Sequence, residues 1–209
     1  MPNFDLDVFR KSDSLAEKLQ VLIDMPLLND SARIVTSDVA CSLSFEHWHS
    51  VRVLLEGGLL PSSIVIHRAQ FEALVRSVWI TYSATDDHIY KLSTDLNLES
   101  EQAAKNLPQV ADMIASIGKS GPREAYDALN RFKDNSWKAL NSYVHAGIHP
   151  IRLHSEGYPV KLIIDVLRNA NGIAVMSAMQ AVILSGEQPM QKDVLELAFE
   201  FSECMPPPL

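Results

Sequence analysis

The chain has 209 residues, of which 47% are apolar, and a formal net charge of −8. This length fits one domain, residues 1–205, which can bury a sizeable core without a disulfide or a metal. The apolar fraction and the few glycines exclude disordered and collagen-like chains. The acidic balance argues against a protein that coats nucleic acid, because that affinity comes from lysine and arginine, and no DNA partner is expected.

The sequence also indicates a compartment. The amino terminus lacks the basic and apolar regions of a secretory signal. The most apolar stretch, residues 173–184, has 12 residues, whereas a membrane span needs about 20, so it predicts a buried core helix and no membrane partner. Cys41 and Cys204 match no metal or redox spacing. We therefore expect a cytoplasmic protein with two free thiols.

Apolar residues recur at helical spacing along the chain, and no sustained alternation typical of strands occurs. N-cap residues, prolines and glycines mark where the helices begin and end. In chain order, we expect helices over residues 4–24, 29–57, 61–84, 85–92, 108–117, 122–146, 159–184 and 189–203. Residues 93–107 and 147–158 are expected to be irregular connections, and residues 206–209 a disordered tail.

Four of these helices have about 25 residues, and most connections between them are short. The pattern predicts an all-α fold, an up-and-down bundle of four long helices with three or four shorter ones around it. Helix 159–184 is apolar nearly all round, which suits a central element or an oligomer seam. Gly172 within it costs about 1 kcal/mol relative to alanine, and either a close helix crossing or a kink would account for it.

Charged residues interrupt the apolar helix 61–84. Arg68, Glu72 and Arg76 are spaced by four residues and therefore form one stripe. One interpretation is a surface ladder of ion pairs, worth a few tenths of a kcal/mol each. The other is a stripe that faces a cleft or a partner.

A second polar set ends the helix 122–146. Asn141 and His145 share a face one turn apart, and histidine can transfer a proton near neutral pH. Alternatively, His145 only caps the helix and interacts with its dipole. Residues 119–152 contain six basic and three acidic side chains, which fits a discrete site for an anionic substrate.

A third set lies in helix 29–57 and comprises Asp38, Ser42, Phe45, Glu46, His47, Trp48 and His49. Glu46 and His49 have the Glu-x-x-His spacing of two-metal bundles, but these sites need a second copy, which the chain lacks. Glycine-rich phosphate loops, nucleophile elbows and dinucleotide fingerprints are also absent from the sequence. We expect neither a metal nor a cofactor.

The segment Asn141-Ser-Tyr-Val-His145-Ala-Gly147 resembles part of the HEPN superfamily, compact helical bundles common in prokaryotic toxins and phage-defence proteins. With the Arg68-x-x-x-Glu72 helix, it is also similar to uncharacterised bacterial families of about this length. Many HEPN proteins are metal-independent ribonucleases whose paired Arg-x(4–6)-His motifs meet in a dimer cleft. The arginine expected before the asparagine is Leu140 in this chain.

The resemblance implies a homodimeric endoribonuclease that binds RNA at a local basic site. His145 would be the general acid or base, and Asn141 and Tyr143 would position the RNA. Charge at phosphorus would be stabilised by Arg68, Arg76 or Lys138. Glu72 and His149 would complete the substrate site. The alternative function is a non-catalytic helical dimer that binds a protein or small ligand through Arg68, Glu72 and Arg76.

Overall fold

A computed structural model describes residues 6–207 of the chain, and this part is all α-helical, without a strand. The predicted fold class is confirmed. The described part contains ten α-helices and two short 3-10 helices, Gln188–Met190 and Ser202–Cys204. The α-helices are α1 (Leu6–Leu22), α2 (Ala32–Glu56), α3 (Leu60–Tyr82), α4 (Asp86–Ser93), α5 (Leu98–Ala104), α6 (Val110–Ser120), α7 (Arg123–Val144), α8 (Ile148–Glu156), α9 (Val160–Ser185) and α10 (Gln191–Glu200).

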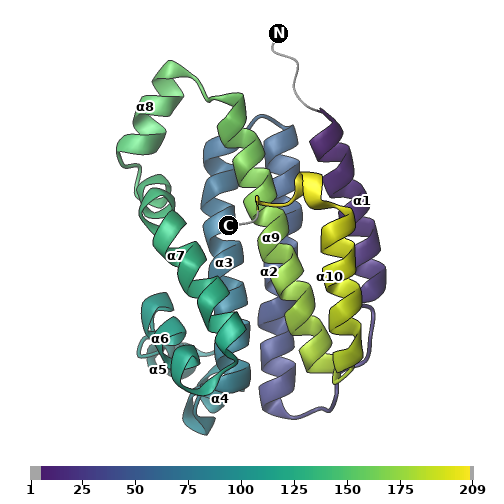
Figure 1. Cartoon of the computed structure of the whole chain (residues 1–209). Helices are drawn as coiled ribbons and strands as arrows, with labels where there is room; N and C mark the ends of the chain where they lie inside the picture. Colours follow the sequence, from purple (N-terminus) through teal and green to yellow (C-terminus); the bar gives the residue numbers. More distant parts are fainter. Residues whose placement is uncertain (1–5, 208–209) are drawn as a thin grey trace.

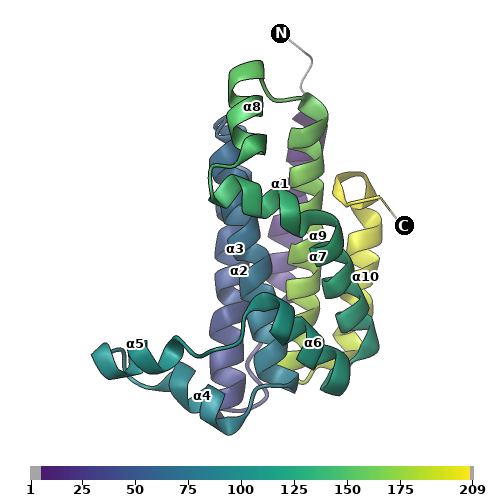
Figure 2. The same cartoon turned by 90° about the vertical axis from the view of Figure 1, so that its left-hand side faces the viewer.

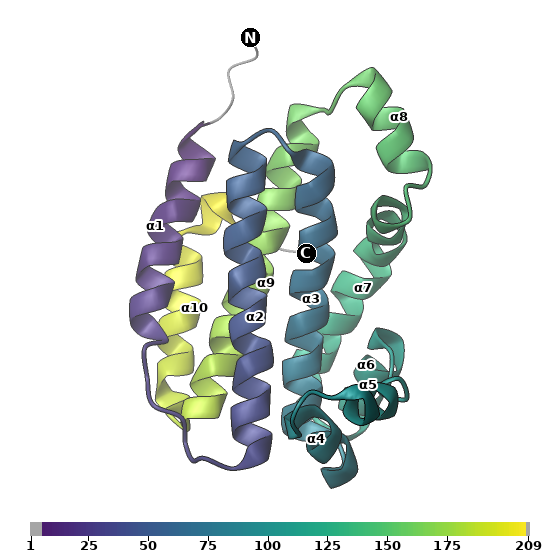
Figure 3. The same ribbon diagram turned by 180° about the vertical axis from the view of Figure 1, so that it is seen from behind.

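The four longest helices are α2, α3, α7 and α9, as predicted. Helices α2, α3 and α9 form the centre of an up-and-down bundle, with α1 and α10 along one side (Figure 1). Helix α7 leans across α3 on the other side, and the view from behind shows α2 between α1 and α3 (Figure 3). The small helices α4, α5 and α6 gather at one end, below α7 (Figure 2).

The core has two parts. One lies among α1, α2, α9 and α10 and includes Leu19 and Trp48; the other lies among α3, α6 and α7 and includes Phe71 and Ile114. Helix α9 has the length and composition to cross a membrane, but half of its apolar window is buried inside the fold. It contacts α2, α3 and α10, which is the packing of a core helix.

Two short helices were not predicted. Helix α5 buries none of its residues, so it has no apolar periodicity to detect, and its start depends on the side chain of Asn97, which accepts hydrogen bonds from Glu99 and Ser100. Helix α8 occupies the segment expected to be irregular. Pro150 lies in its first turn, where a missing N–H costs no intrahelical hydrogen bond. The bundle therefore has six shorter α-helices among the described residues, instead of three or four.

The structure differs in detail from some of the other predictions, and some predicted residues lie outside its described part. Residues 4 and 5 of the first expected helix, like Pro208 and Leu209 of the expected tail, lie outside the described residues. Gly172 closely approaches Pro206, which is not part of a helix. A Cβ added to it would lie 2.9 Å from Cγ of Pro206, so the closest neighbour is a residue of the expected tail. Cys41 and Cys204 are buried free thiols.

The end of α7 is a Schellman motif. The N–H of Gly147 donates to the carbonyl of Ser142 at 2.7 Å, and the N–H of Ala146 donates to that of Tyr143 at 3.4 Å. Helix α7 therefore stops at Val144, with His145 as its C-cap, two residues before the predicted end. This motif requires a left-handed residue, and Ala146 takes that position with φ of +49°.

Candidate functional site

The stripe of Arg68, Glu72 and Arg76 on α3 faces a cleft between α3, α6 and α7. The cavity has a volume of about 310 Å³. Its remaining walls are Gln109, Val110, Ala111 and Met113, at the start of α6, and Trp137 of α7.

The guanidinium of Arg68 contacts two side chains and keeps one nitrogen without a partner within the described part of the chain. Its Nε donates to Oε1 of Glu72 at 2.7 Å, and its guanidinium lies 4.7 Å from the ring centre of Trp137. The side chain is only 19% exposed. Its Nη1 atom is buried and has no hydrogen-bond partner among the described residues.

Arg76 lies two turns further along α3 and also has a buried guanidinium nitrogen without a partner among the described residues. Its guanidinium lies 5.6 Å from the ring centre of Trp79, and its Nη1 is also buried without a partner in the described part of the chain. Burial lowers the pKa of Arg76, and the nearby Glu72 carboxylate opposes this shift. An arginine stays protonated in proteins, so the cleft contains two cationic donors with a free N–H side.

Helix α6 adds backbone donors to the same cleft. Its N-cap residue, Gln109, makes no capping hydrogen bond with its side chain. The first N–H groups of a helix have no intrahelical partner, and the helix dipole makes this end electropositive. Val110 and Ala111 line the cavity, so the N-terminus of α6 lies at its wall. Asp112 in the first turn offsets part of this charge but is not among the lining residues.

The charges of the lining residues suit an anionic ligand. They carry two positive charges and one negative charge, and Glu72 is already paired with Arg68. No serine, cysteine or histidine lines this cavity, so it offers no evident nucleophile, and its one carboxylate is engaged. A carboxylate or phosphate, by contrast, would meet charge-assisted donors from Arg68 and Arg76.

The structure does not bring His145 to these arginines within one chain. His145 lies eight residues after Trp137, about 12 Å further along the helix axis. Leu140 and Tyr143, which lie between them, belong to the core cluster that contains Leu60 and Ile64, at the beginning of α3. His145 is exposed beyond them.

The other predicted residues surround that end of α7. Lys138 is exposed and Asn141 is half-buried. The exposed His149 stacks on Tyr143 with ring centres 6.4 Å apart, and the backbone N–H of His149 donates to Oγ of Ser142. Tyr143 is buried, its hydroxyl has no partner among the described residues, and burial raises its pKa. Leu140, at the expected arginine position, is buried in the core.

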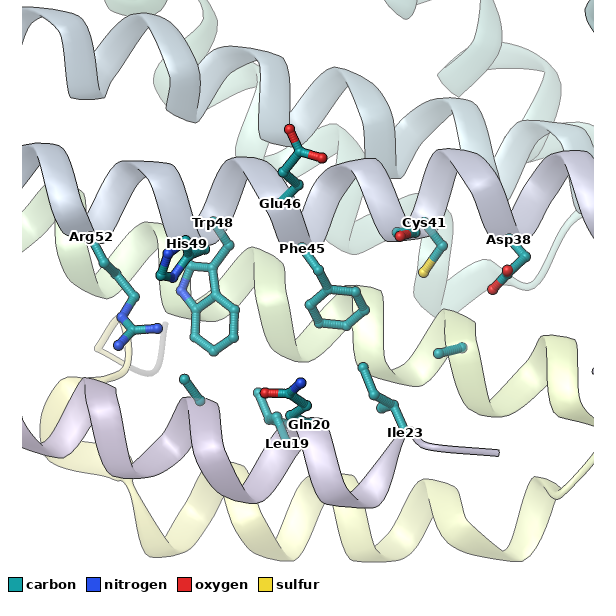
Figure 4. Close-up of a pocket in the computed structure, with 13 residues that line it drawn as sticks. Leu19, Gln20, Ile23, Asp38, Cys41, Phe45, Glu46, Trp48, His49 and Arg52 are labelled. Carbon is teal, nitrogen blue, oxygen red and sulfur yellow. The ribbon is translucent and has the colours of Figure 1, made fainter. Parts of the chain in front are cut away.

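A second and larger cavity, of about 490 Å³, lies between α1 and α2, with Ala181 of α9 also in its lining (Figure 4). The residues of the third predicted set are all on α2, and every one except His47 lines this groove. Among the residues described by the structure, no three histidine, cysteine, aspartate or glutamate side chains gather as a metal site would require.

Trp137 and the α6 residues of the cleft were not among the site residues predicted from the sequence. Trp137 lies four residues before Asn141 on the polar face of α7, and a large aromatic on such a face is a usable signal. The beginning of α6 carries a weaker signal, since Gln109 is a poor N-cap and leaves backbone donors free.

Fold and cavities together define a helical-bundle protein with an arginine-lined cleft. Residues 41–207 match a family of unknown function (DUF6988), and the chain belongs to this family. The matched range contains every residue that lines the cleft, whereas α1 lies before it. Neither the curated proteins nor the solved structures contain a significant match to the chain. Nothing in the family description concerns HEPN proteins, so that resemblance stays a prediction.

Proposed function

We propose that this protein binds a small molecule through an anionic group, a carboxylate or a phosphate, in the cleft of α3, α6 and α7. The observation that carries the proposal is the pair of buried, unpartnered Nη1 atoms of Arg68 and Arg76 at one cavity. This is the non-catalytic alternative drawn from the sequence, now with a small ligand as the bound species.

The energetics support an anionic ligand. A buried polar donor without a partner costs about 1–3 kcal/mol, and more when it is charged. An anion that accepts from both arginines removes this cost and gains charge-assisted hydrogen bonds. The volume of about 310 Å³ lies at the lower end of the range for small-molecule sites. A compact ligand therefore fits best.

The ribonuclease function has less support. Arg68 and Arg76 line the cleft, whereas His145 lies beyond Tyr143 at the end of α7. The histidine would need an arginine from a partner subunit, and Leu140 leaves the motif without its own. The RNA substrate, the homodimer, the toxin or phage-defence setting and the cytoplasmic location all stay predictions.

Isothermal titration calorimetry with phenyl phosphate and benzoate tests the proposal. We expect one saturable site per chain, and a loss of about tenfold or more in affinity for Arg68→Gln or Arg76→Gln, since one charged hydrogen bond is worth about 1.5–3 kcal/mol. Arg131→Gln is the matched control, because Arg131 is exposed on α7 and does not line the cleft. Circular dichroism melts verify folding.

Two results would overturn the proposal. One is that neither probe binds to the wild-type protein. The other is that folded Arg68→Gln and Arg76→Gln bind both probes as tightly as the Arg131→Gln control does.

A further inference from the structure

The groove between α1 and α2 has an apolar floor. Phe45 and Trp48 extend from α2 toward Leu19 and Ile23 of α1 (Figure 4). Leu19 and Trp48 are buried, and the indole N–H of Trp48 donates to Oδ1 of Asn171 at 2.9 Å. These two side chains are therefore fixed by packing and hydrogen bonding, and the half-buried Phe45 and Ile23 provide the accessible aromatic and aliphatic surface.

Asp38 lies at one end of this groove with an uncompensated charge. Its carboxylate makes no hydrogen bond or ion pair with the described residues, and desolvation by burial raises its pKa. Arg52 lies at the other end, about 21 Å further along α2. It pairs with Asp13, its guanidinium lies 5.2 Å from the ring centre of Trp48, and its buried Nε has no hydrogen-bond partner among the described residues.

The remaining polar residues do not balance Asp38. Glu46 brings no positive charge to the lining, and Gln20 and Ser42 are neutral. His49 also lines the groove, but it lies about 16 Å further along α2 than Asp38, near Arg52. Cys41 is 1% exposed, donates its thiol to the carbonyl of Ser177 and has its pKa raised to about 12 by burial, so it stays a thiol and adds no charge. Near Asp38 the groove is therefore apolar and negatively charged.

We propose that this groove binds an organic ammonium ion with an aryl or short alkyl body. The ammonium group would pair with the carboxylate of Asp38, and the apolar body would lie on Phe45 and Ile23. The volume of about 490 Å³ suits one small molecule of this kind.

This site is independent of the anion cleft. The groove is bounded by α1 and α2, and the cleft by α3, α6 and α7, on the opposite side of the α2–α3 pair (Figures 1 and 3). The two sites also select opposite charges. A variant at one site is therefore a control for the other.

Three probes of similar shape test the charge requirement, namely 2-phenylethylammonium, neutral 2-phenylethanol and anionic phenylacetate. We expect the ammonium ion to bind at least tenfold more tightly than the alcohol to the wild-type protein, with amide NMR shifts confined to α1 and α2. Asp38→Asn keeps the side-chain shape and should lose this tenfold preference. Glu56→Gln is the matched control, because Glu56 is exposed on α2 and does not line the groove.

The proposal fails if the ammonium ion and the alcohol bind equally to the wild-type protein, or if the ammonium ion does not bind. It also fails if folded Asp38→Asn retains the preference for the ammonium ion. Shifts in α6 and α7 instead of α1 and α2 would place the binding elsewhere and equally overturn it.

Discussion

Arg68 and Glu72 form an ion pair across one turn of α3, with Nε and Oε1 2.7 Å apart, and this pair leaves Nη1 of Arg68 buried without a partner. The carboxylate therefore fixes the direction of the guanidinium without using all of its donors. Glu72 also lies near Arg76, whose pKa it helps to hold up. One carboxylate between two arginines leaves the cleft with a net positive charge.

Removing the charge of Glu72 should strengthen anion binding. In Glu72→Gln, the ligand no longer meets a carboxylate at the cavity wall, and the two arginine charges are unopposed. We expect the affinity for phenyl phosphate to rise by about three- to tenfold, which corresponds to roughly 0.6–1.4 kcal/mol. Calorimetry measures this, with the exposed Glu124→Gln on α7 as control. A fall in affinity specific to Glu72→Gln would contradict this expectation and show that the orientation of Arg68 by Glu72 outweighs the effect of its charge.

His67 should make the stability of the protein depend on pH. It is buried, its Nδ1 lies 3.0 Å from Oε1 of Gln70, and burial lowers its pKa to about 4. Because the amide of Gln70 donates to the carbonyl of Ala170, its Oε1 is free to accept, and the Nδ1–H of a neutral His67 donates to it.

The unfolded chain binds a proton at His67 below about pH 6.5, whereas the folded chain does so only near pH 4. The contribution of His67 to the free energy of unfolding is therefore at its maximum above pH 6.5. Below this pH it falls by up to about 1.4 kcal/mol per pH unit, down to pH 4. Urea denaturation of the wild type and His67→Gln at pH 7.5, 6 and 5 measures this. Equal slopes for the two proteins would contradict the assignment.

Ala146 occupies a backbone position that suits glycine. Its φ of +49° is left-handed, and such a conformation costs a non-glycine residue about 1–2 kcal/mol. Ala146→Gly should therefore raise the free energy of unfolding by about 1 kcal/mol. Gly147→Ala should lower it, since the new Cβ would lie 2.6 Å from Oγ of Ser142. Chemical denaturation of both variants tests the Schellman motif, and a destabilised Ala146→Gly would refute it.

His145 separates the two proposed functions. If the cleft is the binding site, His145→Ala should change the affinity for phenyl phosphate by less than about twofold, because the histidine is exposed and roughly 12 Å beyond Trp137. If the protein is a ribonuclease, the same variant should abolish RNA cleavage with little change in melting temperature. Both assays use the same folded sample. The binding assay tests the anion site, and the cleavage assay tests the ribonuclease prediction.

The helices that have an apolar face could be predicted from the sequence, because burial imposes the spacing of their apolar residues. Helix α5 was not predicted because it buries none of its residues. Helix α8 was not predicted because Pro150 suggested the end of a helix, whereas it lies in the first turn of α8. At the site, the spacing of Arg68, Glu72 and Arg76 predicts one stripe on α3. That Trp137 and the beginning of α6 would cover this stripe depends on tertiary packing, which local spacing does not encode.

The central claim is that the guanidinium groups of Arg68 and Arg76 bind an anion in the cleft. The most direct measurement is an NMR titration of the arginine Nε–Hε resonances with phenyl phosphate. We predict that Arg68 and Arg76 shift together and saturate, while the exposed Arg131 does not shift. If Arg68 and Arg76 do not respond, or if all arginines shift alike without saturation, the claim is contradicted.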